Sequence, residues 1–196
     1  KGGYDIVFDG PHFNSWRSAN LQHNVIVKVP GEHVFVTFVR KDNDKIKEMK
    51  QVAGRTFCAH APPNLATLAT LDVFDNPSRQ PVILNTKGWD DIYAGVTSGR
   101  CVVGTIPARK LEEFETAGDK VRVIHRTRVM PDNAFSVGPR LNAAEQRRIA
   151  EALTSKDGEE ATRKLRETYA GKKPLVATTS QEYTGLAAYL RNEWGY

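Results

Sequence analysis

Strand-like and helix-like segments alternate through the middle of the chain, and this order constrains the fold more than any other feature of the sequence. Runs rich in β-branched and aromatic residues, closed by Gly, Pro or Asn, are typical of strands. They occupy residues 55–61, 81–86, 101–106 and 121–125. Helical patterns separate them at residues 64–74, 89–98 and 107–114. This β-α-β-α-β-α-β order predicts a parallel, doubly wound sheet with right-handed crossovers.

The two flanks of this central part follow a different pattern. The segment "NVIVKVPGEHVFVTFVRK" predicts two adjacent strands joined at Pro30-Gly31, with no room for a helix between them. Further strands are expected at 5–9 and 134–138, the first followed by a helix that carries Trp16, and further helices at 142–153, 159–169 and 181–194. Asn142 with Glu145 three residues later predicts a capping box. We therefore expect an incomplete lobe I, residues 1–40 plus 133–196, into which lobe II, residues 41–132, is inserted.

Composition and charge exclude several classes of function. The chain of 196 residues has a formal net charge of +5, but its basic residues alternate with acidic ones in stretches such as "RKLEEFE". Such stretches are typical of solvated helix faces, whereas a nucleic-acid binder more often carries a basic stripe with aromatic residues between the charges. No apolar run is long enough to span a bilayer. We therefore expect no nucleic-acid partner and no membrane span.

The sequence carries no recognisable catalytic or cofactor motif. The Gly-x-Ser-x-Gly, P-loop, Gly-x-Gly-x-x-Gly and His-Glu-x-x-His patterns are missing from it. Asp90 and Asp91 are adjacent, and adjacent residues of a helix point in different directions, so we interpret them as carboxylates that complement a helix dipole. The histidines lack metal-ligand spacing. The expectation is a protein that is not an enzyme and that needs no cofactor or metal.

Several segments, in this order, resemble the periplasmic solute-binding proteins of phosphonate, phosphite and phosphate ABC transporters. These segments are "DIVFDGPHF", "VFVTFVRKDNDKIKEMKQVAGRTFCAHAPPNLATL", "GWDDIYAGVTSGRCVVGTIP", "VRVIHRTRVMPDNAFSVGPRLNAAEQRRIAEAL" and "QEYTGLAAYLRNEWG". The resemblance implies the α/β type II periplasmic-binding-protein fold, a two-lobed clamshell of mixed, mostly parallel sheets with helices on both faces. In that family further strands and helices precede the segment that resembles "DIVFDGP", so the N-terminal part of lobe I is expected to be missing.

The resemblance also implies a function and a cellular location. Receptors of this family are periplasmic or secreted, hold a small molecule between their lobes, close by a hinge motion, and deliver the ligand to an ABC permease. We expect a monomer whose hinge strands lie near residues 36–40 and 133–137. Two alternatives stay open: a sensory ligand-binding domain of a signalling system, and an enzyme built on the same bilobal scaffold.

The implied ligand site lies where strands end and helices begin, in agreement with the rule that open α/β sheets bind ligands beyond the carboxyl ends of their strands. The turns "DGPHF", "HAPPNLAT" and "NTKGWDD" occupy such positions. The candidate ligand-binding residues are Gly10, Pro11, His12, Phe13, Pro62, Pro63, Asn64, Leu65, Thr67, Trp89 and Thr105. Phe13 and Trp16 have an alternative interpretation as core residues, and His60 is expected to make only local hydrogen bonds.

The ligand class is left open by three departures from the family pattern. Pro62-Pro63-Asn64 stands where the family has a Ser-Thr-Ser-like run, Trp89 stands near a family His, and Val102 replaces an acidic residue. Each change removes polar groups that would bind an oxyanion. The ligand is therefore either phosphonate-like or phosphate-like, or a small apolar, aromatic or cationic organic molecule held by stacking and cation–π contacts.

The two cysteines, Cys58 and Cys101, fall on neighbouring strands if the doubly wound sheet has the strand order second, first, third. Both lie near the starts of those strands, so their Cα atoms are expected within disulfide range. A periplasmic location would allow the bond to form. We therefore hypothesise a disulfide between Cys58 and Cys101.

Overall fold

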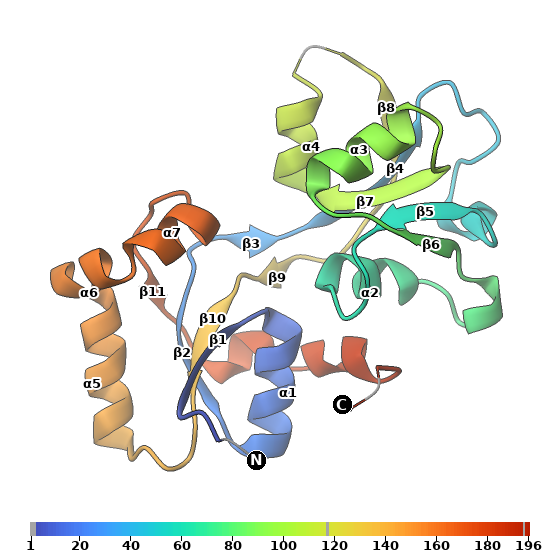
Figure 1. Ribbon diagram of the computed structural model, residues 1–196. Helices are drawn as coiled ribbons and strands as arrows, with labels where there is room; N and C mark the ends of the chain where they lie inside the picture. Colours follow the sequence, from blue (N-terminus) through green and yellow to red (C-terminus); the bar gives the residue numbers. More distant parts are fainter. Residues whose placement is uncertain (1–2, 117, 194) are drawn as a thin grey trace. The chain divides into compact units, whose positions relative to one another are not determined.

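The computed structural model describes residues 3–116, 118–193 and 195–196, which form two units (Figure 1). Unit 1 combines Lys1–Glu32 with Met130–Tyr196, and unit 2 is His33–Val129. The sequence-based boundaries, after residues 40 and 132, differ from these. Residues 33–40 belong with unit 2 because their strand pairs on both sides with strands of that unit.

Unit 2 contains a five-stranded sheet in the order β6-β5-β7-β4-β8. Its strands are β4 (Phe35–Arg40), β5 (Thr56–Ala59), β6 (Val82–Asn85), β7 (Val103–Pro107) and β8 (Val121–Arg126). β5 pairs in parallel with both β6 and β7, so the predicted order second, first, third is confirmed. β4 lies antiparallel between β7 and β8. Four of the five strands therefore run in one direction, as the resemblance implied for most strands.

Helices cover both faces of the unit 2 sheet (Figure 1). They are η1 (Met49–Val52), α2 (Leu65–Leu71), η2 (Pro77–Arg79), α3 (Trp89–Thr97) and α4 (Ala108–Phe114). Cys58 packs in a core cluster with residues of α3 and α4. Its neighbour Phe57 packs on the opposite face, in a cluster with residues of η1. This alternation of buried residues explains why β5 is an uninterrupted apolar run in the sequence.

Unit 1 contains a four-stranded sheet in the order β1-β10-β2-β11, in which every neighbouring pair is antiparallel. The strands are β1 (Ile6–Asp9), β2 (Asn24–Lys28), β10 (Ala134–Val137) and β11 (Val176–Ala177). The expectation of mostly parallel strands is wrong for this sheet. β1 and β2 do run in the same direction, joined by a helix, but the returning strand β10 inserts between them.

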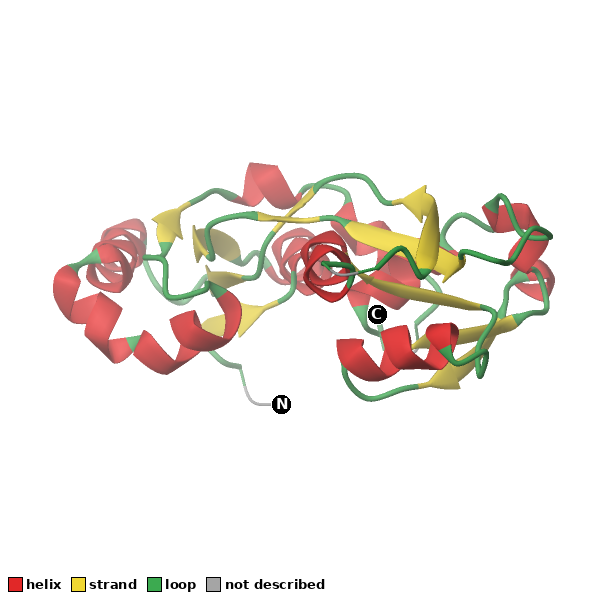
Figure 2. Ribbon diagram, turned by 90° about the horizontal axis from the view of Figure 1, so that it is seen from above, coloured by secondary structure: helices red, strands yellow, loops and turns green. Residues whose placement is uncertain are grey.

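Helices form a layer on each side of the unit 1 sheet (Figures 1 and 2). The helices are α1 (Pro11–Leu21), α5 (Ala143–Thr154), α6 (Lys156–Ala161), α7 (Arg163–Tyr169), η3 (Ser180–Tyr183) and η4 (Leu186–Leu190). The predicted capping box is confirmed, because Asn142 and Glu145 exchange side-chain-to-backbone hydrogen bonds at the start of α5. The helix predicted over 181–194 is wrong. Two 3₁₀ helices replace it, separated by Gly185, whose φ of 79° is left-handed.

The chain passes between the units at residues 32–33 and 129–130. The short strands β3 (Glu32–His33) and β9 (Met130–Pro131) pair there. Most of the predicted hinge segments, residues 36–40 and 133–137, lies inside the sheets, in β4 and β10, each of which has a partner strand on both sides. A hinge motion at these strands stays a prediction.

Two imidazoles, the buried His23 and the half-buried His125, predict how the free energy of unfolding depends on pH. Burial and the nearby Arg17 charge lower the pKa of His23, and burial lowers the pKa of His125. The unfolded chain then binds more protons than the native protein below about pH 6.5. Stability contributed by the two neutral rings is present above that pH and lost as the pH falls through their lowered pKa values. We expect the free energy of unfolding, measured by denaturant titration, to fall between about pH 7 and pH 5.

The matched variant for this experiment carries His23→Gln and His125→Gln. Removing both imidazoles should flatten the pH dependence in this interval, which lies above the range where carboxylates titrate. A wild-type free energy of unfolding that stays constant over the interval would contradict the prediction.

Candidate functional site

The carboxyl ends of β5 and β6 bring two of the predicted turns together in unit 2. The strands are parallel neighbours, so the chain leaves both at the same edge of the sheet. The Thr86 backbone N–H donates to the Ala59 carbonyl at 2.9 Å, and the Ala61 N–H donates to Asn85 Oδ1 at 3.1 Å. These bonds hold the turn before α2 beside the turn before α3.

The turn before α2 uses its polar side chains to hold its own backbone. Asn64 caps α2, its Oδ1 accepting a hydrogen bond from the Ala66 N–H at 3.0 Å. Thr67 Oγ1 donates to the His60 carbonyl at 2.7 Å. The Pro62-Pro63 bond is cis. Leu65, another predicted ligand residue, is buried. The structure thus gives Asn64 and Thr67 a role in shaping the turn.

The turn before α3 places an indole against an imidazole. Gly88 adopts a φ of 87°, and a Cβ there would lie 2.6 Å from Asp90 Oδ1, so the turn favours glycine. Trp89 then begins α3, and its ring meets the His60 ring edge-on, with 4.3 Å between centroids and an interplanar angle of 75°. Both rings are half-buried. The sequence-based interpretation gave His60 only local hydrogen bonds and missed this contact.

The disulfide hypothesised from the strand order is present beneath α3. Cys58 and Cys101 are bonded, with 5.7 Å between their Cα atoms. A Cβ at Gly95 of α3 would lie 2.6 Å from Cys58 Sγ, so the helix packs directly on the disulfide. Tyr93, which packs against the same core cluster, also anchors this helix through a hydrogen bond from its hydroxyl to Glu115. Burial, with that contact, raises the pKa of Tyr93 to about 12.

Thr105 lies in the interior of unit 2. Its hydroxyl is 2.8 Å from Thr37 Oγ1 and accepts a hydrogen bond from Thr70 Oγ1 at 3.0 Å. All three threonines are about 1% exposed. The structure therefore places this predicted ligand residue in a buried hydroxyl network, where its hydrogen bonds to other threonines satisfy it.

In unit 1, the predicted turn between β1 and α1 is held by a dense set of hydrogen bonds. Asp9 Oδ1 accepts from the Gly10 N–H, and Asp9 Oδ2 accepts from Arg17, both at 2.8 Å. Asn14 Nδ2 donates to the carbonyls of Asp9 and Ala134. Pro11 occupies the first helical turn, where a missing N–H costs nothing. This turn is a rigid element at the start of α1.

A cluster of rings follows this turn. The His12 and Phe13 rings lie 4.0 Å apart, and Tyr196 meets both Phe13 and Trp16 with 5.4 Å between ring centroids. His12 is buried, whereas Phe13 and Trp16 are half-buried. Gly10 is tightly packed, because a Cβ there would lie 3.0 Å from the His12 ring. Tyr196 thus gives Phe13 and Trp16 a packing partner that the sequence-based interpretation did not include.

The part of the chain that the structure describes holds neither a metal-binding cluster nor a helix that could cross a membrane. Within residues 3–116, 118–193 and 195–196, no group of three or more His, Cys, Asp or Glu side chains is placed to hold a metal ion. None of the helices in this part of the chain is both long and apolar enough to cross a membrane.

Known structures share the fold at low sequence identity. XAC2383 from Xanthomonas citri, solved bound to ATP, matches with a TM-score of 0.70 and 15% identity over 95% of this chain and 77% of its own. A binding protein component of a phosphonate ABC transporter, PA3383 from Pseudomonas aeruginosa, matches with a TM-score of 0.57 and 11% identity over 91% and 65%. Tv2483, solved bound to L-arginine, gives 0.55 and 13% over 88% and 68%.

The family comparison extends over most of the chain. Among curated proteins, none matches the sequence. A family model for periplasmic substrate-binding proteins of phosphonate ABC transporters matches residues 1–183. The predicted resemblance, the two-lobed α/β class and the role as a receptor for small molecules are thereby confirmed. Substrate-binding proteins of this kind work with transporter permeases, and the chain belongs to the periplasmic substrate-binding protein family of phosphonate ABC transporters.

Proposed function

We propose that this protein binds a small organic ligand with a planar ring or a cationic group, in the periplasm, and delivers it to an ABC permease without chemical conversion. The observation that carries the proposal is the pair of His60 and Trp89 rings at the carboxyl ends of β5 and β6. Half-buried aromatic rings beside strand ends offer faces for stacking and for cation–π contact. That the ligand lies between the two lobes is an implication of the family and stays a prediction.

The chemistry of the turn before α2 supports an organic ligand over an oxyanion. Pro62 and Pro63 carry no backbone N–H. The N–H groups of Asn64 and Ala66 already donate to Ala61 O and Asn64 Oδ1, and the Thr67 hydroxyl donates to a carbonyl. A phosphate or phosphonate needs several donors to replace its hydration, and burying it with few of them costs free energy. This turn offers an apolar wall instead.

A phosphonate is the second candidate ligand, favoured by the family to which residues 1–183 belong. Phe13, His12 and the turn at Gly10 would then contribute from unit 1, and Lys87, which is exposed beside Gly88, would supply positive charge. A sensory domain would bind a ligand in the same way and differ only in its partner. An enzyme would convert the ligand, so mass analysis of the ligand after incubation separates it from a receptor.

A thermal-shift screen tests the proposed ligand class. A ligand that binds only the native state raises the melting temperature by mass action. We expect aromatic or cationic metabolites to raise it, whereas inorganic phosphate, phosphite and simple phosphonates leave it unchanged. A rise with a phosphorus oxyanion alone would reject the organic ligand and favour the second candidate.

Substitutions at Trp89 test the aromatic contact directly. Trp89 packs against the core as well as against His60, so Trp89→Ala would change stability and affinity together. Trp89→Leu keeps apolar volume and removes the ring, and we expect it to weaken binding of the best screening hit about ten-fold, since a desolvated ring contact contributes roughly 1–2 kcal/mol. The measurement is isothermal titration calorimetry.

The matched control is Trp89→Phe, which keeps an aromatic face and should retain most of the affinity. Equal affinities of the Leu variant and the wild type would remove Trp89 from the binding site. Trp16→Leu, in the ring cluster of unit 1, reports whether loss of an indole elsewhere has the same effect.

A further inference from the structure

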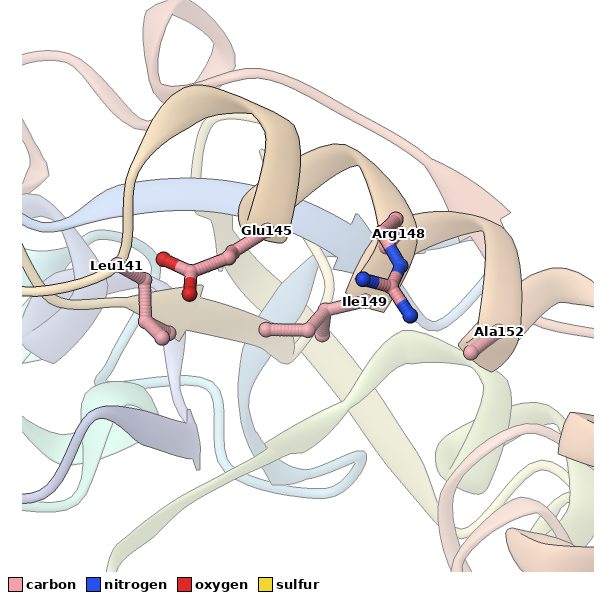
Figure 3. Close-up of a pocket in the computed structure, with 5 residues that line it drawn as sticks. All are labelled: Leu141, Glu145, Arg148, Ile149 and Ala152. Atoms are coloured by element: carbon pink, nitrogen blue, oxygen red, sulfur yellow. The ribbon is translucent and has the colours of Figure 1, made fainter.

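Helix α5 has an open, partly apolar face that the proposed function does not use. Glu145, Arg148, Ile149 and Ala152 on the helix, with Leu141 just before it, line a groove of about 360 Å³ (Figure 3). The spacing of the four helical residues places them within about one third of the helix circumference. Glu145, Arg148 and Ala152 are exposed, and Leu141 and Ile149 are half-buried.

This groove is separate from the face by which α5 joins the core. Ala150 and Leu153 pack against the buried cluster of unit 1, which includes Val27 and Val29. Among the described residues, no side chain forms a hydrogen bond or ion pair with the Arg148 guanidinium. Glu145 uses one carboxylate oxygen, Oε2, to accept from the Asn142 N–H. Within the part of the chain that the structure describes, the groove therefore carries an unpaired arginine, Arg148, and a glutamate, Glu145, whose second carboxylate oxygen accepts no hydrogen bond. Both lie beside the apolar residues of the groove.

We propose that this groove is a homodimer interface in which α5 of one subunit packs antiparallel on α5 of a second copy. The two-fold axis passes between residues 146 and 147. Each residue then lies opposite the partner residue that is equally far from this point along the helix, in the other direction. Glu145 then faces the partner's Arg148, and Arg148 faces the partner's Glu145. Leu141 faces the partner's Ala152, so a large side chain meets a small one at each end of the contact.

Self-complementarity is the reason to choose a second copy as the occupant. In an isologous interface every contact occurs twice, so the antiparallel arrangement forms two Glu–Arg pairs from one helix face. A parallel arrangement would instead place Glu145 beside the partner's Glu145 and Arg148 beside the partner's Arg148. Like charges in contact disfavour association. The charge order along α5 thus selects one orientation.

The interface is expected to be weak. One helix face per subunit buries less than the roughly 800 Å² per partner of a standard interface. We expect a dimer with a dissociation constant in the micromolar range or weaker, so that the subunits exchange readily.

A charge-swap experiment tests the interface by sedimentation velocity over a series of protein concentrations. The wild type should show a reversible monomer–dimer equilibrium. Arg148→Glu alone should remain monomeric, because it places Glu145 opposite a glutamate, and Glu145→Arg alone should remain monomeric for the opposite reason. When the two variants are mixed, each Glu of one subunit faces an Arg of the other, and a heterodimer should form.

Arg147→Glu is the matched control, because this residue is exposed on the opposite side of α5 and the substitution reverses the same charge. It should dimerise as the wild type does. Melting temperatures of all variants establish that they are folded, which matters for Glu145→Arg because it removes half of the capping box. A wild type that is monomeric at every concentration, or a dimer insensitive to Arg148→Glu, would overturn the proposal and leave the groove to another polypeptide.

Discussion

Replacing both Cys58 and Cys101 with alanine is expected to lower the free energy of unfolding by about 4 kcal/mol. The disulfide closes a loop between residues separated by 43 positions, and opening such a loop raises the conformational entropy of the unfolded chain. Both cysteines are buried, so alanine also leaves a small void under α3. Denaturant titration of the variant and of the oxidised wild type measures the difference.

The reduced wild type separates the bond from the void. It keeps both sulfur atoms and should lose most of the same free energy of unfolding in the presence of reductant. Thiol titration in denaturant, before and after reduction, establishes that the oxidised protein carries the bond. Free thiols in the oxidised protein, or equal stability of the oxidised and reduced forms, would contradict the prediction.

The same pair of cysteines shows which features of the fold can be predicted from the sequence alone. The alternation of strands and helices between residues 55 and 125 predicts a doubly wound sheet. The strand order assumed for that sheet, which the structure shows as β6-β5-β7, places the two cysteines on neighbouring strands. The capping box at Asn142 is equally local, since its members are three residues apart. Features set by local pattern and by the topology of one continuous segment are predictable.

Features that depend on distant segments could not be predicted. β10 lies between β1 and β2 although the chain travels through all of unit 2 before it returns, so the antiparallel sheet of unit 1 has no local signature. Tyr196 meets the rings after β1 from the far end of the chain. The Ser180–Leu190 region has helix-like spacing but breaks at Gly185, where the left-handed backbone ends the first turn.

The candidate site shows the same division. The sequence correctly places the turns at strand ends, because β5 and β6 are parallel neighbours. The sequence does not reveal which side chains use their hydrogen-bonding groups to hold those turns. Thr67 and Thr105 are small polar residues at suitable positions, yet their hydroxyls bond to His60 O and to other threonines. His60 differs from these threonines in the opposite way. The sequence assigned it only local hydrogen bonds, whereas in the structure its ring lies against the Trp89 ring.

Helix α3 can pack closely on the sheet because the second residue of β7 is a glycine, Gly104. A Cβ at Gly104 would lie 2.8 Å from Val96 Cγ2, 2.9 Å from Ile92 Cγ2 and 3.3 Å from Phe38 Cζ. Those three side chains are completely buried, so none of them has space into which to move. The distance between α3 and the sheet at this point therefore determines how far Trp89, the first residue of α3, lies from the strand ends.

Gly104→Val should therefore destabilise the protein by roughly 3 kcal/mol, at the upper end of the cost of overpacking a core. Gly104→Ala should cost less, because it adds one methyl group. We also expect the valine variant to weaken ligand binding, since α3 must move outward and carry Trp89 away from His60. Denaturant titration gives the stability, and calorimetry with the best screening hit gives the affinity.

Combining Gly104→Ala with Val96→Ala distinguishes steric overlap from a general loss of packing. The second substitution removes the atom nearest to the added methyl group, so the double variant should be more stable than the sum of the two single losses predicts. A purely additive result would mean that α3 does not rest on Gly104. Recovery of ligand affinity in the double variant, together with stability, would link the position of α3 to the aromatic pair, because neither substituted residue belongs to the turns that carry His60 and Trp89.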